Sequence, residues 1–299
     1  MTSKFIRIGT RESQLAVWQA TTVQQLLETH GYRAELHYIK SDGDTDLKTP
    51  LYEIGVQGIF TRALDIALLN GDIDIAVHSM KDVPTMMAKG IAQAAVLPRA
   101  SYYDVLVPAP GYTPEGALGS RIIATSSIRR KAQWLHRYPA DTLENLRGNV
   151  NTRLRKVAES QWHGAIFAAA GLERIGLRPD NAITLDWMLP APAQGAIMVV
   201  SRDGDAESQD ACSPLNDADT ALCTKIERDF LRALMGGCST PISALARIAS
   251  GKLHFEGNVL SVDGKDKKEI SRVVDADMAG NIGFEAGNEI AALLSGNVV

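Results

Sequence analysis

The chain has 299 residues, a formal net charge of −4 and an apolar content of 45%, so it is long enough for two or three domains and can bury sizeable cores. Its three cysteines form no Cys-x-x-Cys pair, and its six histidines show no ligand spacing with them, which argues against a disulfide framework and against a metal site. No apolar stretch is long enough to cross a bilayer, and residues 1–8 lack a signal-peptide pattern, so we expect a cytoplasmic protein with free thiols and no membrane partner.

The first hundred residues alternate strands with helices. Their apolar pattern predicts strands over 5–9, 34–39, 73–77 and 91–97, and helices over 10–30 and 58–70. Thr10 or Ser13 caps the start of the first helix, and Gly71 caps the end of the second. Residues 41–56 are rich in Gly, Asp and Thr and have no period, so we expect a loop there and consider it a candidate lid.

A second alternation follows. Strands are predicted over 105–107, 121–124, 165–170 and 196–200, and helices over 128–138 and 152–160. This order is typical of an α/β fold with parallel sheets, in which ligands bind at the C-terminal ends of the strands. No Gly-x-Gly-x-x-Gly segment or P-loop is present, so nothing indicates a nucleotide cofactor.

The pattern changes after residue 201. The acidic, turn-rich residues 202–219 predict a linker. We then expect a helix over 217–234, antiparallel strands over 244–249, 253–262 and 270–274, and a closing helix over 283–294. These elements form a small α+β domain.

Positive charge is concentrated in residues 121–178. This segment contains eleven Lys or Arg against four Asp or Glu, which gives +7 and leaves −11 for the rest of the chain. A basic segment inside an acidic protein favours a local anionic ligand over a nucleic-acid surface. Most of these cations are arginines, which suit two-point recognition of carboxylate or phosphate.

Polar and charged residues follow several of the predicted strands. In Ser79–Pro84, Asp82 is either a solvated charge in a surface turn or a carboxylate held for acid–base work or cation stabilisation. Arginines adjoin three strand–helix junctions, at Thr10–Ser13, Thr125–Arg130 and Arg147–Arg155. Simple N-capping by Thr or Ser would explain the hydroxyls of this junction. The helix dipole disfavours cations in the first turn, however, so Arg129 and Arg130 favour a bound anion.

Cys238 lies in the loop Leu234–Pro241, behind Gly236 and Gly237. A free cysteine is often a small buried residue, but the two glycines also allow the loop to display the thiol. The sequence of the loop alone leaves both interpretations open.

Together these motifs resemble the porphobilinogen deaminases, also called hydroxymethylbilane synthases. The resemblance runs in order and spacing from about residue 6 to about residue 249, and Ala76–Pro84 (Ala-Val-His-Ser-Met-Lys-Asp-Val-Pro) is highly specific. It implies two α/β lobes similar to type II periplasmic binding proteins and a small C-terminal α+β domain. The implied domains are 1–98 plus 195–212, 99–194, and 213–299.

The resemblance also implies an activity. Members of this family are transferases of tetrapyrrole and haem biosynthesis that join four porphobilinogen units into linear hydroxymethylbilane, with loss of ammonia at each step. Growth starts from a dipyrromethane cofactor, for which Cys238 would form the thioether. Each porphobilinogen carries an acetate and a propionate, so an arginine-lined cleft suits the growing chain. The resemblance further implies a monomer that binds no nucleic acid.

Site residues are carried over position by position. The implied catalytic residues are Asp82, Lys81, Arg11, Arg129, Arg147 and Arg153. The implied cofactor-binding residues are Cys238, Ser79, Lys81, Asp82, Thr125, Ser126, Ser127, Arg129, Arg130, Arg147 and Gly148. The implied substrate-binding residues are Arg11, Ser13, Arg147, Arg153, Arg174 and Gln194. Asp82 would bind pyrrole N–H groups and stabilise a cationic azafulvene, and no metal is implied.

Four positions depart from the family pattern, namely Asp42, Gln57, Met235 and Ser239, and two other functions compete. Gln57 stands where a lysine is usual, and Asp42 where many members have arginine, so one carboxylate of cofactor or substrate loses a cationic partner. A two-lobe solute-binding protein for an anionic ligand would explain the arginines but gives Cys238 no role. A regulatory domain that binds a phosphorylated ligand at Thr125–Arg130 leaves Asp82 unexplained.

Overall fold

The computed structural model describes residues 5–40, 61–113, 120–234 and 240–295. Its contacts divide the chain into two compact units. The first unit comprises Met1–Asp46, Gly58–Ala100 and Gly195–Ala221, and the second comprises Leu47–Gln57, Ser101–Gln194 and Leu222–Val299.

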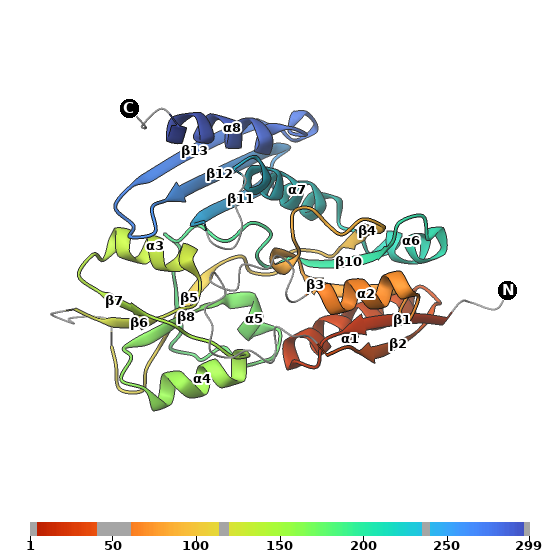
Figure 1. The fold of residues 1–299 in the computed structure, drawn as a ribbon, viewed down its shortest axis with the longest axis horizontal. Helices are drawn as coiled ribbons and strands as arrows, with labels where there is room; N and C mark the ends of the chain where they lie inside the picture. The colour runs from red at the N-terminus through yellow and green to blue at the C-terminus, as the bar shows by residue number, and fades with distance from the viewer. Residues whose placement is uncertain (1–4, 41–60, 114–119, 235–239, 296–299) are drawn as a thin grey trace. The chain divides into compact units, whose positions relative to one another are not determined.

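The first unit is built on a mixed sheet with the strand order β2-β1-β3-β10-β4 (Figure 1). Its strands are β1 (Phe5–Thr10), β2 (Arg33–Tyr38), β3 (Ile75–Ser79), β4 (Ile91–Val96) and β10 (Ile197–Arg202). β1 pairs in parallel with β2 and β3, whereas β10 runs antiparallel to both β3 and β4. Alternate residues of β1, Ile6 and Ile8, enter the core, as the period of a strand requires.

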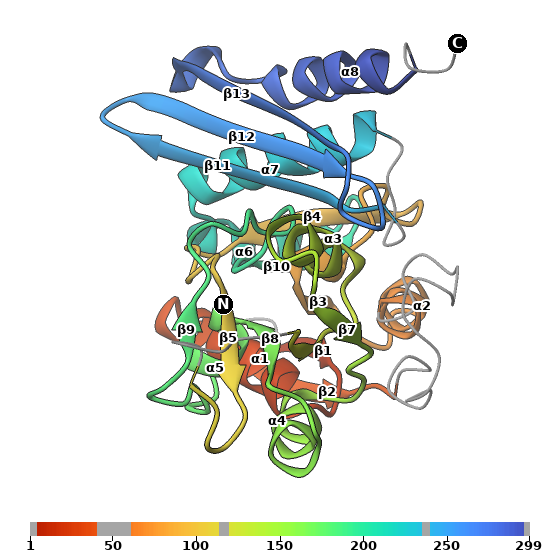
Figure 2. The ribbon, with the colours of Figure 1, turned by 90° about the vertical axis from the view of Figure 1, so that its left-hand side faces the viewer.

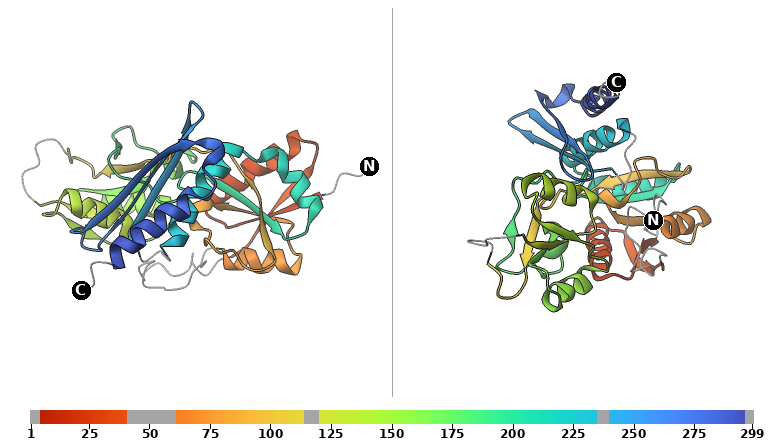
Figure 3. Two further views of the ribbon diagram at one scale, coloured as in Figure 1. Left: turned by 90° about the horizontal axis from the view of Figure 1, so that it is seen from above. Right: turned by 60° about the vertical axis from the view of Figure 1, so that its left-hand side comes forward.

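Helices cover both faces of this sheet. The helices are α1 (Gln14–Thr29), α2 (Arg62–Asn70) and α6 (Ala206–Cys212). α1 and α6 lie on one face and α2 on the other (Figure 3, left). Accordingly, Val23 and Leu27 of α1 share one core cluster with Ala211 of α6.

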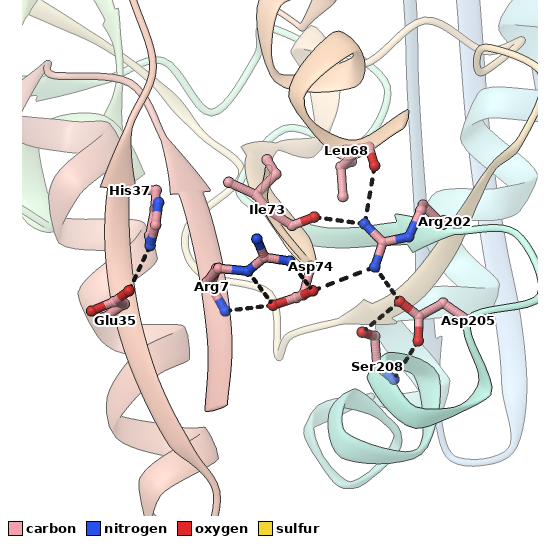
Figure 4. Close-up of polar contacts among 9 residues, drawn as sticks. All are labelled: Arg7, Glu35, His37, Leu68, Ile73, Asp74, Arg202, Asp205 and Ser208. Atoms are coloured by element: carbon pink, nitrogen blue, oxygen red, sulfur yellow. Dashed lines mark hydrogen bonds and ion pairs between the residues drawn. The ribbon is translucent and has the colours of Figure 1, made fainter. Parts of the chain in front are cut away.

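Asp74, just before β3, ties β10 to the rest of this sheet (Figure 4). Its carboxylate is 3% exposed and accepts hydrogen bonds from Arg7 of β1 at 2.8 and 3.0 Å. Arg202, at the end of β10, donates to the same carboxylate, to the carbonyl of Ile73 and to Asp205. A buried carboxylate held by two guanidinium groups thus fixes a strand that lies far along the chain from its neighbours.

The second unit contains a mixed sheet with the order β7-β6-β8-β5-β9. Its strands are β5 (Asp104–Pro108), β6 (Ile122–Ala124), β7 (Thr142–Glu144), β8 (Gly164–Ala168) and β9 (Ile183–Thr184), and its helices are α3 (Ile128–Arg137), α4 (Val150–Glu159) and α5 (Ala169–Glu173). β7, β6 and β8 are parallel, and β5 is antiparallel to β8 and β9. In both sheets, therefore, the fourth strand in the order, β10 or β5, runs antiparallel to the other four.

A three-stranded antiparallel sheet, β11-β12-β13, completes the second unit (Figure 2). It comprises β11 (Ile242–Ala249), β12 (Lys252–Leu260) and β13 (Lys267–Asp275), with α7 (Ala218–Ala233) and α8 (Ile282–Ser295). Phe230 of α7 packs edge-on against Phe255 of β12, with ring centroids 5.3 Å apart. Added Cβ atoms at Gly283 and Gly287 of α8 would collide with α7, so the two helices pack closely.

The predicted α/β class and the small C-terminal α+β domain are confirmed, and several details are wrong. The two larger sheets are mixed rather than parallel, because β10 and β5 run against their neighbours. Residues 202–219 are not a linker, since α6 begins there with Asp205 as its N-cap. The predicted strand over 165–170 ends at Ala168, where α5 starts, and β7 and β9 were not predicted.

Two expectations stay predictions. The proposed division into three domains is not decided by the two units. The candidate lid over 41–56, with Asp42, lies outside the described residues, as does Gln57.

Candidate functional site

In the first unit, predicted site residues follow β1 and β3, the two central parallel strands. Ser13 is the N-cap of α1, and its Oγ accepts a hydrogen bond from the amide of Ala16 at 3.4 Å. Gln19 of α1 donates to Oγ of Ser79 at 2.9 Å. The start of α1 is thereby tied to the end of β3, and Arg11 lies half-buried in the turn between β1 and α1.

The chain after β3 forms a short 3₁₀ turn, Met80–Asp82. Met80 anchors it, because this side chain is 1% exposed and its amide donates to the carbonyl of Ala196 at 3.0 Å. Lys81 is half-buried and Asp82 is exposed. The turn therefore holds the Asp82 carboxylate outward at a strand end without burying it.

His78, the residue before Ser79, is buried beneath this turn. Its Nε2 is buried and has no hydrogen-bond partner among the described residues. Burial, with a smaller contribution from the positive charge of Arg11, lowers the pKa of His78 to about 3. The imidazole is therefore neutral at neutral pH, and it lines a small pocket together with Thr61, Asp65 and Val83.

In the second unit, hydroxyl residues order the junction between β6 and α3. Ser127 is the N-cap of α3, and its Oγ accepts from the amide of Arg130 at 3.4 Å. Ser126 donates to the carbonyl of Leu146 at 2.7 Å, and the hydroxyl of Thr125 accepts from the amide of Ser127 at 3.2 Å. Capping by a hydroxyl residue, the simpler of the two interpretations of this junction, is therefore observed.

Arg129 and Arg130 both bind Asp104 of β5. Nη2 of Arg129 lies 2.7 Å from Oδ2 of Asp104, and Nη2 of Arg130 lies 2.7 Å from Oδ1. Burial alone would raise the pKa of Asp104, but Arg129, Arg130 and Gln194 outweigh it and lower the pKa to about 2. In this structure Asp104 thus supplies an anion at the start of α3, and two guanidinium groups share its single negative charge.

Asp104 was missed as a site residue. The available signal was an acidic residue directly before the apolar run Val105–Val107, where a buried charge requires a partner. Its partners lie 25 and 26 residues further along the chain.

Arg147, Gly148 and Arg153 lie together at the start of α4. Gly148 has φ +113°, a conformation that favours glycine. Nε of Arg153 donates to the carbonyl of Gly148 at 2.8 Å. The backbone conformation of Gly148 therefore helps to set the position of the Arg153 guanidinium. Arg147 is only 4% exposed.

Arg174 and Gln194 are also in the second unit. Arg174 follows α5, and burial lowers its pKa to about 10, so it remains charged at neutral pH. Gln194 is 1% exposed, and its amide donates to Asp104 at 2.9 Å and to the carbonyl of Tyr102 at 2.8 Å. Its side chain thus supports the ion cluster, and its role in substrate binding stays a prediction.

The predicted site residues that the structure describes form two groups, one in each unit. Arg11, Ser13, Ser79, Lys81 and Asp82 belong to the first unit, and Thr125 to Arg130, Arg147, Gly148, Arg153, Arg174 and Gln194 to the second. Cys238 lies outside the described residues. Across the described ranges, no three His, Cys, Asp or Glu residues are grouped to hold a metal ion, and no helix combines the length and apolar content needed to span a membrane.

Two family models together match most of the chain. Residues 6–210 match the model for the dipyromethane cofactor binding domain of porphobilinogen deaminase, and residues 221–292 match the model for its C-terminal domain. The chain belongs to the porphobilinogen deaminase family. The resemblance stated from the motifs is thereby confirmed.

Curated members of the family align with nearly the whole chain. The porphobilinogen deaminase of Syntrophotalea carbinolica is 44% identical over 272 residues, which cover 88% of this chain and 85% of that protein. The protein of the same name from Chloroherpeton thalassium is 41% identical over 301 residues and covers 97% of this chain and 95% of that protein. The chloroplastic enzyme of Oryza sativa is 41% identical and covers 96% and 83%, respectively.

Similarity to solved structures is lower. The methionine-binding protein MetQ aligns with 72% of this chain and 91% of its own, with a TM-score of 0.46 and 13% identity. This similarity is too low to support an argument about function.

Proposed function

We propose that this protein is a porphobilinogen deaminase, a transferase that joins four porphobilinogen molecules into hydroxymethylbilane with release of one ammonia per unit. The observation that carries this conclusion is the pair of family matches over residues 6–210 and 221–292. The relative with 44% identity over 88% of the chain supports it. A solute-binding function is not favoured, because it accounts for neither match.

We further propose that a dipyrromethane cofactor is attached to Cys238 through a thioether, which resists hydrolysis. The other two thiols suit attachment poorly, since Cys212 and Cys223 are buried and burial raises the pKa of Cys212 to about 12. When bound, the cofactor supplies the pyrrole carbon from which the chain grows.

The described residues fit an anionic group of this kind. The Arg129–Arg130 pair keeps a surplus of one positive charge over Asp104, and the buried Nε of Arg129 has no acceptor among the described residues. We assign the carboxylates of cofactor and substrate to Arg11, Arg129, Arg130, Arg147, Arg153 and Arg174. Ser13, Ser79, Lys81, Thr125 to Ser127, Gly148 and Gln194 would add hydrogen bonds. Buried guanidinium groups hold carboxylates more strongly than exposed ones, because the local dielectric is lower.

Asp82 is the proposed catalytic carboxylate. It is exposed and follows β3 in a turn that Met80 anchors. From this position the carboxylate can accept pyrrole N–H hydrogen bonds and stabilise the positive charge that develops on the substrate as ammonia leaves.

The remaining assignments follow from the same proposal. The protein would act as a cytoplasmic monomer on a small-molecule substrate and bind no nucleic acid. Its domains would be residues 1–98 with 195–212, residues 99–194, and residues 213–299.

Intact-mass measurement of freshly purified protein tests this proposal. We expect a mass excess equal to two condensed porphobilinogen units in the wild type and in Cys223→Ala, and no excess in Cys238→Ser. An unmodified wild-type protein that still polymerises porphobilinogen would contradict the thioether. A modified protein that releases no ammonia from porphobilinogen would contradict the reaction.

A further inference from the structure

Glu227 of α7 is a fully buried carboxylate that binds two separate pieces of backbone. Its Oε2 accepts from the amide of Ala193 at 2.6 Å, and its Oε1 accepts from the amide of Ala246 in β11 at 2.7 Å. The residue is 0% exposed. One side chain thus joins the C-terminal sheet to the segment that connects β9 with β10.

Ala193 has an unusual backbone conformation. Its φ is +62°, and Ser250 is the only other non-glycine residue with positive φ among the described residues. Residues with a Cβ rarely adopt this conformation and keep it only where neighbouring contacts enforce it. The hydrogen bond to Glu227 is such a contact, because it fixes the amide of the left-handed residue itself.

The next residue, Gln194, binds the carboxylate that holds the arginine pair. Its Nε2 donates to Oδ1 of Asp104 at 2.9 Å. Asp104 in turn binds Arg129 through Oδ2 and Arg130 through Oδ1. An unbroken series of buried contacts therefore runs from α7 through the turn at Ala193 to both guanidinium groups.

A second connection to this segment bypasses Glu227. Gln133 of α3 donates to the carbonyl of Leu189 at 2.9 Å and to Oγ of Ser243 in β11 at 2.9 Å. It also accepts from the amide of Leu189. This contact holds the start of the segment, where the carbonyl of Leu189 also accepts from Arg129 at 2.8 Å, but it reaches neither Ala193 nor Gln194. Ser243 lies one contact further from the arginines, so a substitution there provides the comparison.

We propose that Glu227 is a positioning residue for substrate binding, which holds Ala193 in its left-handed conformation so that Gln194 and Asp104 fix the orientation of Arg129 and Arg130. The inference rests on the proposed function only where it uses porphobilinogen as the substrate. Glu227 itself touches no substrate in this scheme. Its effect depends on the conformational preference of the residue at position 193.

The test combines Glu227→Gln with Ala193→Gly. A glutamine cannot accept from both backbone amides, because one of its two terminal atoms is a donor. We expect Glu227→Gln to lower kcat/KM for porphobilinogen about tenfold, mainly through KM, because small displacements of binding groups weaken recognition. Glycine adopts positive φ without strain, so the double variant should recover most of this loss, whereas Ala193→Gly alone should change little.

Hydrogen exchange supplies a readout independent of activity. Glu227→Gln should speed exchange of the 189–194 segment, and Ser243→Ala should leave both the amide of Ala193 and kcat/KM unchanged within about twofold. Glu227→Asp keeps the charge but is too short to span both amides, so it provides a second variant that Ala193→Gly should also rescue. A double variant no better than Glu227→Gln would overturn the proposal. A wild type inactive on porphobilinogen would instead contradict the proposed function, and the exchange measurements would still decide the role of Glu227.

Discussion

Oδ1 of Asp104 accepts two hydrogen bonds from Arg130, from Nη2 at 2.7 Å and from Nε at 3.0 Å. The two side chains are 0% and 8% exposed. Since Oδ2 of the same carboxylate binds Arg129, a single buried negative charge is the shared counter-charge of two cations. The strand β5 thus contributes the group that allows both arginines to be buried at the start of α3.

Removal of this carboxylate should therefore be costly. We expect Asp104→Asn to lower the free energy of unfolding by about 3–5 kcal/mol, because two buried guanidinium groups lose their counter-charge. Denaturant unfolding measures the effect. Glu256→Gln is the matched control, since Glu256 pairs with Arg247 at a site where both side chains are 49% exposed, and its loss should stay below about 1 kcal/mol. A similarly small loss for Asp104→Asn would contradict the claim that Asp104 is the counter-charge that allows Arg129 and Arg130 to be buried.

His78 should make stability depend on pH. An unfolded histidine takes up its proton near pH 6.5, whereas burial lowers the pKa of His78 to about 3 in the folded protein. Between these values the unfolded state binds more protons, so stability falls as pH decreases, by about 1.4 kcal/mol per pH unit from this group. Above pH 6.5 the contribution is constant.

Comparison of wild type with His78→Gln isolates this contribution. Denaturant unfolding at pH 7.5, 6 and 5 should show a shallower pH dependence in the variant. Between pH 7 and 8 the free energy of unfolding should change with pH by the same amount in the two proteins. Parallel profiles down to pH 5 would show that His78 is not held neutral.

Gly148 should not tolerate a side chain. An added Cβ would lie 2.7 Å from Cγ2 of Thr152, at a residue whose φ is +113°. We expect Gly148→Ala to raise KM for porphobilinogen about tenfold, equivalent to about 1.4 kcal/mol of binding, because Arg153 donates to the carbonyl that must move.

Gly176→Ala is the control for backbone strain alone. Gly176 has φ +65°, but no atom lies within 4 Å of its added Cβ. Its cost should be about 1–2 kcal/mol of stability, with KM unchanged. Equal KM values in the two variants would argue that the loop before α4 does not set the position of Arg153.

Asp82 should be important for turnover and unimportant for folding. Because its side chain is exposed and Met80 anchors the turn, Asp82→Asn should change the free energy of unfolding by less than about 0.5 kcal/mol. The same substitution should lower kcat by at least about a hundredfold, since it removes a charge that stabilises the developing cation. Asp72→Asn, at another exposed carboxylate of the first unit, should leave kcat unchanged. Near-normal turnover in Asp82→Asn would remove Asp82 from its proposed role.

Features with local causes could be predicted from the sequence. The sequence predicts a hydroxyl cap at Thr10 or Ser13 and another within Thr125–Ser127, and the caps are Ser13 and Ser127. An N-cap can be predicted because it depends on a hydroxyl and the amide three residues later. The three antiparallel strands of the C-terminal sheet were also predicted, since their alternation and the turns between them are contained in one short stretch. The motifs taken together, of which Ala76–Pro84 is the most specific, indicate the family, and the comparisons confirm it.

Features that depend on distant partners could not be predicted in this way. The direction of β10 is set by pairing with β3 and β4, more than a hundred residues earlier. The acidic, turn-rich residues 202–219 predict a linker, whereas Asp205 accepts from the amide of Ser208 and caps α6 there. The burial of Arg129 and Arg130 requires Asp104. The apolar run beside Asp104 indicates a buried charge, but it does not identify the two arginines that pair with it, which lie 25 and 26 residues away.

The position of β10 has a consequence for the order in which the protein matures during synthesis. β3 and β4 do not pair with each other, because β10 lies between them and forms hydrogen bonds with both. While a ribosome has made only the first 190 residues, β4 therefore lacks its neighbour and one edge of β3 is open. All strands of the β7-β6-β8-β5-β9 sheet precede that point, so the sheet that is encoded later can close first. The N-terminal sheet is complete only after β10, which is encoded after the second sheet, has been synthesised. Until then the open edges of β3 and β4 make the nascent chain most prone to aggregation.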